Sequence, residues 1–279
     1  MEKLFERNWN YHPFEFRIEN DLPEYVNHFN FSIIDTHAVA PTVTAIHSHL
    51  DKDFVLLQKS TDTKLEILPN NKESFMALVK RKTELAPYGL ILVGGKSERM
   101  GRDKFSLELK GKTLVQLAYE KLSAICPQVF ISCRENQKDE AALKPFPQIH
   151  DRFMSLGPSG GIMSAQILKP ERPWIVLACD LANVSMTSLN FLVQKRDPLS
   201  FATCFSNTVK RGVDPLCALY EPKSLVRFFE FIALGNYCPR KMLNNSKVAL
   251  LDISNISNKD ELMNFNTPEE FSKLASQND

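Results

Sequence analysis

The sequence lacks an excess of charge of either sign, since its 279 residues include 34 Lys and Arg against 33 Asp and Glu. This balance argues against a general nucleic-acid or membrane-surface binder, although it leaves room for a local basic site. No apolar run approaches the roughly 18 residues that a transmembrane helix requires. Residues 1–17 are charged and aromatic, without the apolar core of a signal peptide. These absences predict that neither a nucleic acid nor a membrane is a partner.

Cysteine pairs of the C-x-x-C type are also absent. The sequence has six cysteines, most of them inside apolar runs: Cys126, Cys133, Cys179, Cys204, Cys217 and Cys238. This pattern favours buried free thiols in a reducing compartment over disulfides or a thiolate metal site. We therefore expect a cytoplasmic protein.

Two common phosphate-binding motifs are missing. A Walker A loop reads G-x-x-x-x-G-K-[ST], and although Gly111-Lys112-Thr113 matches its end, Ser106 stands at its first glycine. The dinucleotide fingerprint G-x-G-x-x-G is excluded because Gly94 and Gly95 are adjacent and the next glycine is Gly101. The sequence therefore carries neither of these loops.

A different glycine-rich stretch, Leu90–Lys104, is the centre of the sequence. It opens with the apolar run LILV, which predicts a buried strand, and continues into a loop with three glycines. Its basic residues, with one slightly beyond, are Lys96, Arg99, Arg102, Lys104 and Lys110. Glycines let a backbone approach a bulky anion, and basic side chains neutralise that anion. The stretch favours a phosphate cradle, with a charged surface turn as the alternative.

Two regions are predicted: a small α/β region of unknown role over residues 1–86 and an α/β domain over residues 87–279. In the first, strands are expected at Phe31–Asp35, Phe54–Gln58 and Lys64–Leu68, and a helix at Lys72–Leu85. In the second, strands are expected at Gly89–Val93, Gln128–Cys133, Pro147–His150, Trp174–Cys179, Ser200–Phe205, Pro215–Tyr220 and Lys247–Asp252. Helices are expected at Thr113–Ile125, Ile162–Leu168, Met186–Lys195, Pro222–Leu234 and from Thr267 onward. Such alternation of apolar strands with helices predicts a mostly parallel sheet covered on both faces.

Carboxylates follow two of the predicted strands. Asp151 follows Pro147–His150, and Asp180 ends the run WIVLAC. Ligands of parallel sheets bind at the carboxyl ends of the strands, where the predicted cradle also lies. An Asp in this place is commonly a helix cap, but beside a phosphate cradle it is also a candidate Mg²⁺ ligand. Since no activated Ser, Cys or His nucleophile stands out, the pattern fits phosphate transfer by positioning and charge neutralisation.

The stretch LILVGGKSERMGRDK resembles the L-A-G-G-x-S-x-R-M-G-x-D-K signature of the nucleotidyltransferases with a Rossmann-like fold. Within that group the sequence is most similar to the molybdenum cofactor guanylyltransferases, over about residues 88–276. Further similarities are the GPSGG sequence expected as a loop at Gly157–Gly161, the Cys179-Asp180 pair, the Pro215–Tyr220 strand and the Asn264–Glu270 tail. The resemblance implies a three-layer Rossmann-like nucleotidyltransferase fold. The sequence departs from the family pattern at Val93, Ala182 and Asp214, where members commonly have Ala, Pro and His.

The resemblance also implies the reaction and the residues of the site. The terminal phosphate of molybdenum-bound molybdopterin would attack the α-phosphate of GTP, forming the guanine dinucleotide cofactor and releasing pyrophosphate, with Mg²⁺ as cofactor. The implied catalytic residues are Arg99, Lys104 and Asp180, with Asp180 as the metal ligand. The implied nucleotide-binding residues are Leu92, Val93, Gly94, Gly95, Lys104, Arg134, Asp151 and Asp180. Besides GTP and molybdopterin as substrates, molybdoenzyme apoproteins or other cofactor-biosynthesis proteins are the implied partners.

Other interpretations stay open at the level of sequence. The same fold would serve a cytidylyl- or sugar-phosphate nucleotidyltransferase, and the additional N-terminal region would suit a non-catalytic cofactor-delivery subunit. That region resembles, in its FVLLQK and KLEILPNNKESF segments, the end of the GTP-binding partner protein of the same pathway. Its His47-Ser48-His49 sequence has no carboxylate or cysteine at an obvious ligand spacing, which argues against a metal site there.

Overall fold

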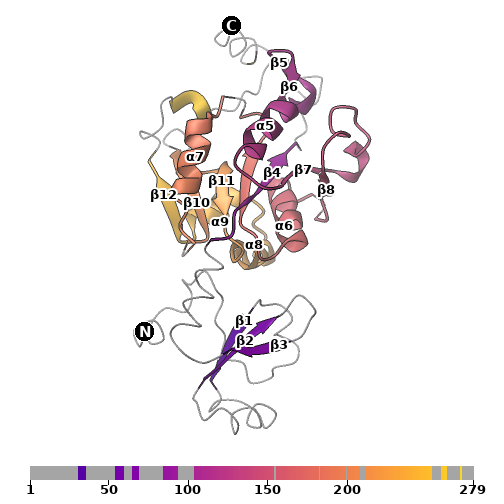
Figure 1. Cartoon of the computed structure of the whole chain (residues 1–279). Coiled ribbons are helices and arrows are strands. Elements are labelled where there is room, and N and C mark those ends of the chain that lie inside the picture. The colour runs from indigo at the N-terminus through magenta and orange to yellow at the C-terminus, as the bar shows by residue number, and fades with distance from the viewer. Residues whose placement is uncertain are drawn as a thin grey trace. The chain divides into compact units, whose positions relative to one another are not determined.

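The computed structural model describes residues 31–35, 54–59, 65–68, 84–93, 104–153, 155–181, 183–198, 200–207, 212–252, 259–262 and 271. The chain divides into two compact units, residues 1–85 and 86–279. In the first unit, β1 (Phe31–Asp35), β2 (Phe54–Lys59) and β3 (Leu65–Leu68) form an antiparallel sheet in the order β1-β2-β3 (Figure 1). The predicted strands are found here, whereas His47, His49 and most of the predicted helix lie outside the described residues.

The second unit is built on a sheet of seven strands. They are β4 (Tyr88–Leu92), β7 (Val129–Cys133), β8 (Gln148–His150), β9 (Trp174–Ala178), β10 (Ala202–Asn207), β11 (Gly212–Tyr220) and β12 (Val248–Leu251). Their order is β12-β10-β11-β9-β4-β7-β8. Neighbouring strands are parallel except at β11, which is antiparallel to both β10 and β9. The predicted mostly parallel sheet is confirmed.

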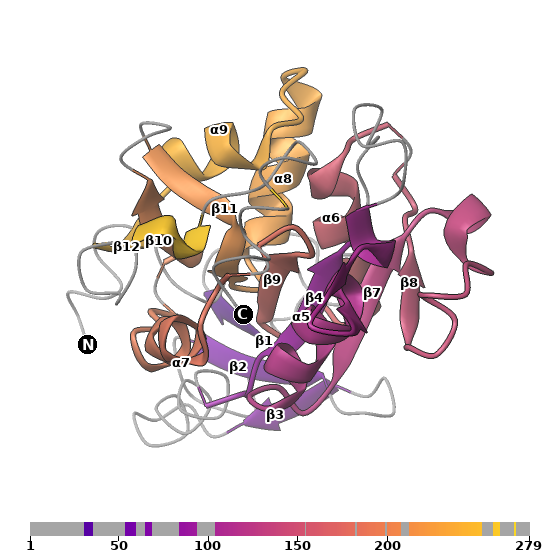
Figure 2. The same cartoon turned by 90° about the horizontal axis from the view of Figure 1, so that it is seen from above.

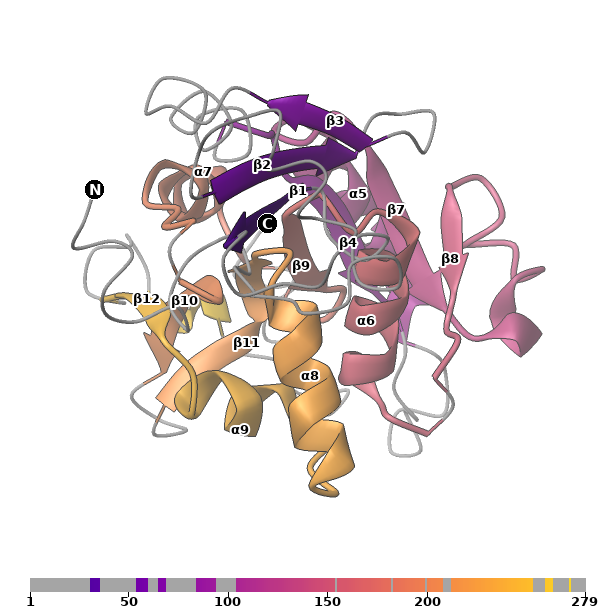
Figure 3. The same ribbon diagram turned by 90° about the horizontal axis from the view of Figure 1, so that it is seen from below.

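Helices cover both faces of this sheet. One face carries α5 (Leu114–Ser123) and α7 (Met186–Gln194), and the other carries α6 (Pro158–Leu168), α8 (Ser224–Ala233) and α9 (Pro239–Asn244) (Figures 2 and 3). Side chains alternate between the faces of a strand. Accordingly Ile91 and Val93 pack with α5, while Leu90 and Leu92 pack with α6. The result is a three-layer α/β domain with two cores.

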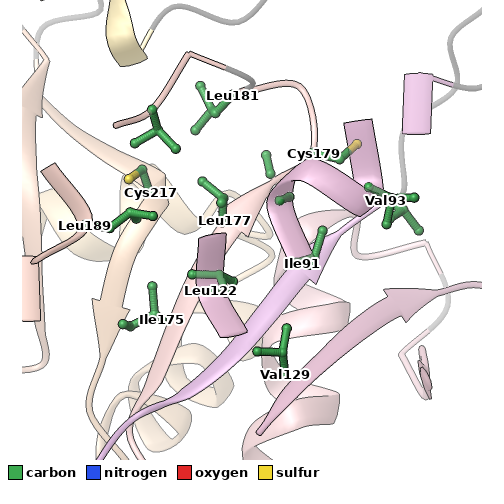
Figure 4. Packing of buried hydrophobic residues seen from close by; sticks show 14 of the residues in the cluster. Ile91, Val93, Leu122, Val129, Ile175, Leu177, Cys179, Leu181, Leu189 and Cys217 are labelled. Carbon is green, nitrogen blue, oxygen red and sulfur yellow. The ribbon is translucent and has the colours of Figure 1, made fainter. Parts of the chain in front are cut away.

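The central strands are buried on both faces, which explains their nearly continuous apolar sequences. In the core beneath α5 and α7, Ile91, Leu122, Ile175 and Leu177 are at most 1% exposed (Figure 4). Each such side chain contributes about 1.5–3 kcal/mol relative to an exposed position. The central strands β4 and β9 therefore give rigid support to the residues that follow their carboxyl ends.

The order of the strands creates a topological switch point beside β4. From β4 the chain passes to β7 and then to β8 on one side, and afterwards it crosses to β9 on the other side. The strand that follows β4 in the chain thus lies on one side of it, and β9 lies on the other. In sheets of this kind, ligands bind at the carboxyl ends of the strands around such a point.

Helix α6 begins four residues before the predicted Ile162, so the prediction of a loop through Gly161 was wrong. Gly157 is the N-cap with φ 58°, Pro158 occupies the first turn, and Gly160 and Gly161 are helical. Proline is favoured there because its fixed φ suits a helix start and its missing N–H has no intrahelical acceptor. The glycines serve close packing here, because a Cβ at Gly161 would lie 2.3 Å from Ser132 Oγ.

Two of the small elements that were not predicted from the sequence bear on its interpretation. One is a hairpin of β5 (Glu108–Leu109) and β6 (Lys112–Thr113), whose turn residues Lys110 and Gly111 both have positive φ, as a type I′ turn requires. The partial Walker sequence is therefore a hairpin turn. The other element is α9, too short for a clear period in the sequence.

Among the described residues, no helix is both long and apolar enough to cross a membrane.

Candidate active site

An ion pair lies at the carboxyl end of β9, the strand that pairs with β4. The Nζ of Lys104 is 3.0 Å from Oδ2 of Asp180, and the two side chains are 17% and 15% exposed. Lys104 is the first described residue after Val93, and Asp180 follows the end of β9. The last residue of the predicted phosphate cradle and the strand-end carboxylate, which the sequence singled out separately, therefore meet at one point.

Buried neighbours hold each member of this pair in place. Lys104 begins a short 3-10 helix, Lys104–Ser106, in which Phe105 is 1% exposed and packs into the core beneath α5. Asp180 stands between Cys179 and Leu181, which are 5% and 2% exposed. The backbone N–H of Cys179 donates a hydrogen bond to the Leu92 carbonyl, 3.1 Å away. Both charged groups are thus carried by anchored backbone, which favours a preformed site.

The end of β4 contributes backbone rather than side chains. The N–H of Val93 donates to the Ser132 carbonyl at 3.3 Å, and the Val93 side chain is 4% exposed within the core (Figure 4). The departure from the family's alanine therefore adds its two methyl groups to the core. The nucleotide-binding role of this strand end stays a prediction, which would rest on its backbone because the Val93 side chain is buried.

Asp151 lies at the carboxyl end of β8, where its backbone N–H donates to the Cys133 carbonyl at 3.0 Å. Its Oδ1 accepts hydrogen bonds from the Phe153 N–H, 2.9 Å away, and from the Ser164 hydroxyl, 3.5 Å away. Burial raises the pKa of Asp151, and these two hydrogen bonds offset part of the rise. The carboxylate is a partly desolvated hydrogen-bond acceptor at the same edge as Asp180.

Arg134 follows β7 and is exposed at this edge. Gln137 belongs to the 3-10 helix Glu135–Gln137 and is 3% exposed. Its Oε1 accepts from both the backbone N–H of Arg134, at 3.1 Å, and the Arg134 Nε, at 3.2 Å. The guanidinium stem is therefore fixed while the rest of the group remains accessible. This arrangement suits contact with an anionic or aromatic ligand.

The first turn of α6 forms a wall behind these residues. A Cβ at Gly161 would lie 3.1 Å from Leu92 Cδ2, besides the contact with Ser132 Oγ. A Cβ at Gly160 would lie 2.7 Å from both carboxylate oxygens of Asp151. The sequence predictions did not include Ser132 or Ser164. For Ser164 there was one weak signal, a hydroxyl inside a mostly apolar helical run.

The structure thus brings the predicted residues that it describes to one edge of the sheet, where Lys104 and Asp180 form an ion pair. The residues at this edge are Leu92, Val93, Lys104, Arg134, Asp151 and Asp180. Gly94, Gly95 and Arg99 lie outside the described residues. The individual roles of all these residues stay predictions.

The donor set bears on whether Mg²⁺ fits. Within the described residues, no group of three or more His, Cys, Asp or Glu side chains could enclose a metal ion. Mg²⁺ in phosphate-transfer sites is usually held by one or two carboxylates together with substrate phosphates and water. Asp180 is partly accessible and has a cationic neighbour where phosphates would bind. These residues fit a metal that arrives with a nucleotide, and they do not fit a substrate-independent metal cage.

Comparison with known protein families identifies the family to which this chain belongs. Residues 89–249 match the family described as the MobA-like NTP transferase domain. The chain belongs to this family. It is a nucleotidyltransferase, and the predicted family resemblance is confirmed. The match spans the sheet from β4 to β12, and it includes the Lys104 and Asp180 positions.

Two individual relatives support the assignment of the chain to this family. The chain is 34% identical over 187 residues to a molybdenum cofactor biosynthesis bifunctional protein of Synechocystis sp., covering 67% of this chain and 53% of that protein. It therefore spans about half the length of that relative. It is 28% identical over 190 residues to a probable molybdenum cofactor guanylyltransferase of Synechococcus elongatus, covering 66% of this chain and 96% of that protein.

A solved structure shares the fold. Molybdopterin-guanine dinucleotide biosynthesis protein A from Archaeoglobus fulgidus superposes with a TM-score of 0.57 at 23% identity, covering 68% of this chain and 97% of that one. At this identity the likeness establishes the three-layer nucleotidyltransferase fold and nothing finer. The substrates of this chain need an argument from its own residues.

Proposed function

We propose that this nucleotidyltransferase transfers GMP from GTP to the terminal phosphate of molybdenum-bound molybdopterin. An oxygen of the acceptor phosphate forms a bond to the α-phosphorus of GTP, and the bond from that phosphorus to the β-phosphate oxygen breaks. The products are the guanine dinucleotide form of the cofactor and pyrophosphate. The observation that carries the proposal is the Lys104–Asp180 pair at the switch point of a MobA-like fold.

Lys104 and Asp180 have complementary tasks in this reaction. The ammonium group of Lys104 binds the triphosphate and stabilises the charge that develops on the departing pyrophosphate. Asp180 would hold Mg²⁺ together with phosphate oxygens, and the bound ion would supply charge neutralisation and polarisation of the α-phosphate. Both groups stand on anchored backbone, so little reorganisation is needed during transfer.

The remaining residues would hold the nucleoside. The backbone at Leu92 and Val93 lines the carboxyl end of β4, and Asp151 offers a partly desolvated carboxylate to hydrogen-bond donors of the ribose or base. Arg134 is available to a phosphate or a ring system at the same edge. The choice of guanine and molybdopterin is supported by the guanylyltransferase and molybdenum cofactor names of the relatives.

The proposal is tested by measuring pyrophosphate release from GTP, CTP, UTP and ATP with Mg²⁺, each alone, with molybdenum-loaded molybdopterin, and with sugar and polyol phosphates. We expect release only with GTP and the pterin together. Release with CTP and a sugar phosphate or polyol phosphate, and none with the pterin, would assign the chain to another branch of the fold. Tight GTP binding without turnover would instead favour a cofactor-delivery subunit.

Two pairs of variants test the residues. Asp180→Ala should abolish turnover with the fold intact, while Asp139→Ala, which alters an exposed carboxylate, should leave turnover unchanged. Lys104→Met should reduce turnover strongly, whereas Lys112→Met breaks the exposed pair with Glu120 and should not. Retained activity in Asp180→Ala would contradict the proposed metal role.

A further inference from the structure

Ser164 is a fully buried hydroxyl beside the candidate site. It lies in the second turn of α6 and is 0% exposed. Its Oγ accepts a hydrogen bond from the backbone N–H of Arg152, 2.9 Å away. The hydroxyl proton can be donated to the Gly160 carbonyl at 2.8 Å or to Asp151 Oδ1 at 3.5 Å. A serine that bonds only to the carbonyl four residues earlier is common in helices, but this one also holds the residues that follow β8.

The contacts of Ser164 are part of a larger set of contacts around the Asp151 carboxylate. Oδ1 also accepts from the Phe153 N–H at 2.9 Å, which closes a tight turn over Asp151, Arg152 and Phe153. A Cβ at Gly160 would lie 2.6 Å from the Phe153 carbonyl oxygen and 2.7 Å from both oxygens of the carboxylate. The first two turns of α6 thus support the carboxylate from behind, through a missing side chain and a hydroxyl.

The two oxygens of Asp151 have different surroundings. The Phe153 N–H donates to Oδ1, and the Ser164 hydroxyl can donate to the same oxygen when its proton is not given to the Gly160 carbonyl, whereas within the described part of the chain no hydrogen bond reaches Oδ2. A carboxylate oxygen accepts up to two hydrogen bonds. One oxygen therefore fixes the orientation of the group, and the other can accept from a ligand.

We propose that Ser164 is a positioning residue, which holds the Asp151 turn so that the carboxylate can accept hydrogen bonds from the nucleoside of the bound nucleotide. This inference rests on the proposed function, because it takes Asp151 as a nucleoside contact. Ser164 itself is buried and does not touch the substrate. Its effect passes through Asp151 alone, and the phosphate-binding residues Lys104 and Asp180 are independent of it.

The test compares two ligands and two buried serines. Binding of GTP and of inorganic tripolyphosphate, both with Mg²⁺, is measured by calorimetry on the full-length chain carrying Ser164→Ala or Ser224→Ala. Ser224 is also 0% exposed, and its hydroxyl accepts from Gln166 Nε2 at 2.7 Å and donates to the Glu221 carbonyl at 2.8 Å. It is a matched control, because the same atom is removed from an equally buried position at the start of α8.

We expect Ser164→Ala to weaken GTP binding about tenfold, which corresponds to the loss of roughly one hydrogen bond to a charged group. The affinity for tripolyphosphate should change by less than about twofold. Ser224→Ala should change neither affinity by more than about twofold, whatever it does to the melting temperature. An equal loss of GTP affinity in the two variants would overturn the proposal, as would an equal loss of GTP and tripolyphosphate affinity in Ser164→Ala.

A double-mutant cycle with Asp151→Asn separates a positioning role from a general structural one. If Ser164 acts through Asp151, the variant Ser164→Ala/Asp151→Asn binds GTP no more weakly than Asp151→Asn. Additive losses would overturn the proposal. Ser164→Cys, a near-isosteric change with a weak donor, is subjected to the same comparisons if Ser164→Ala does not fold.

The outcome for the wild type keeps the two proposals apart. Binding of CTP or UTP in place of GTP contradicts the proposed guanylyl transfer, and the Ser164 comparison is then decided with that nucleotide. Failure of every nucleoside triphosphate to bind more tightly than tripolyphosphate contradicts the role of Asp151 and overturns the proposal for Ser164 as well.

Discussion

The ammonium group of Lys104 lies 3.0 Å from Oδ2 of Asp180, although the two residues are 76 positions apart in the chain. Asp180 is the proposed metal ligand, and Lys104 is the proposed phosphate ligand. The lysine therefore lies on the side of the carboxylate where a cation would bind. Under the proposed function, a bound triphosphate would give Lys104 a stronger partner, and Asp180 would then be available to a metal ion.

This relationship predicts competition between the lysine and a divalent cation. In the absence of nucleotide, Lys104→Met should bind Mn²⁺ about fivefold more tightly than the wild type, because a partly exposed ion pair is worth about 1 kcal/mol. Electron paramagnetic resonance of free Mn²⁺ measures the affinity. Lys112→Met, which breaks an exposed pair elsewhere, is the control. Unchanged or weaker Mn²⁺ binding in Lys104→Met would contradict the competition.

Gly161 predicts a steric link between α6 and the end of β4. Its substitution by alanine places a Cβ 2.3 Å from Ser132 Oγ and 3.1 Å from Leu92 Cδ2. We expect Gly161→Ala to destabilise the domain by about 1–3 kcal/mol, as overpacking generally does, and to weaken GTP binding by moving Leu92. In Gly161→Ala/Ser132→Ala the closest contact is gone, so part of the stability should return. Urea denaturation measures the stability of the single and the double variant. A Gly161→Ala variant as stable as the wild type would contradict the close packing.

A buried ion pair at the opposite end of the sheet should matter for stability. Arg196 donates from Nε and from a terminal nitrogen to the two carboxylate oxygens of Glu221, at 2.7 and 2.9 Å, and the side chains are 10% and 2% exposed. Burial raises the pKa of Glu221, and the hydrogen bonds from Arg196 oppose that rise. Arg196→Met leaves a buried carboxylate without its partner and should cost about 3–5 kcal/mol.

The measurement for this pair uses Trp174, which is 0% exposed in the second unit. The sequence has two tryptophans, so in a Trp9→Phe background its fluorescence reports on that unit alone. The double variant Arg196→Met/Glu221→Gln should be more stable than Arg196→Met. The control Lys112→Met should cost less than about 1 kcal/mol. A similar cost for both single variants would show that the buried pair contributes no more than a surface pair.

The lysine Lys223 should make the stability of the fold depend on pH. Burial, assisted by the nearby Lys247, lowers the pKa of Lys223 to about 8 from 10.5. The folded protein then holds fewer protons than the unfolded chain between these values, so this lysine destabilises the fold below pH 8, and the cost disappears as the pH rises to 10.5. The stability advantage of Lys223→Met over the wild type should therefore be largest near pH 7 and shrink above pH 8.

The difference between variant and wild type is the quantity to measure in this experiment, because buried cysteines act in the opposite direction. Burial raises the pKa of Cys126 to about 12 and that of Cys133 to about 11, so their folded forms stay protonated where unfolded thiols ionise. These contributions cancel between the two proteins. An advantage of Lys223→Met that is constant from pH 7 to pH 10.5 would contradict the lowered pKa.

The thiols should react unequally. All six cysteines are free, and Cys238 is the exposed one, whereas the other five are buried. A thiol reagent such as DTNB should label one site per native chain and six per chain in denaturant. Cys238→Ser should abolish rapid labelling of the native protein. Rapid labelling of a second thiol would show that one of the buried cysteines is accessible in solution.

The order of elements in the second unit was predictable because its signals are local. Apolar runs such as WIVLAC mark strands that are buried on both faces, and the strand from Gly89 was placed within one residue of β4. The start of α6 was misplaced, because glycines at Gly160 and Gly161 look like a loop in sequence. Their real role depends on Asp151, which follows β8, and on Ser132, which lies in β7.

The sequence by itself determined the strand–helix alternation, the glycine-rich basic stretch after β4 and the carboxylates at strand ends, since each depends on residues close together in the chain. Only the tertiary structure decided which of these groups meet. Lys104 reaches Asp180 because β9 pairs with β4 across the switch point, and Ser164 reaches the Asp151 turn because α6 packs over β8. Such contacts depend on long-range strand pairing and on burial shared between elements, for which a local pattern of residues carries no signal.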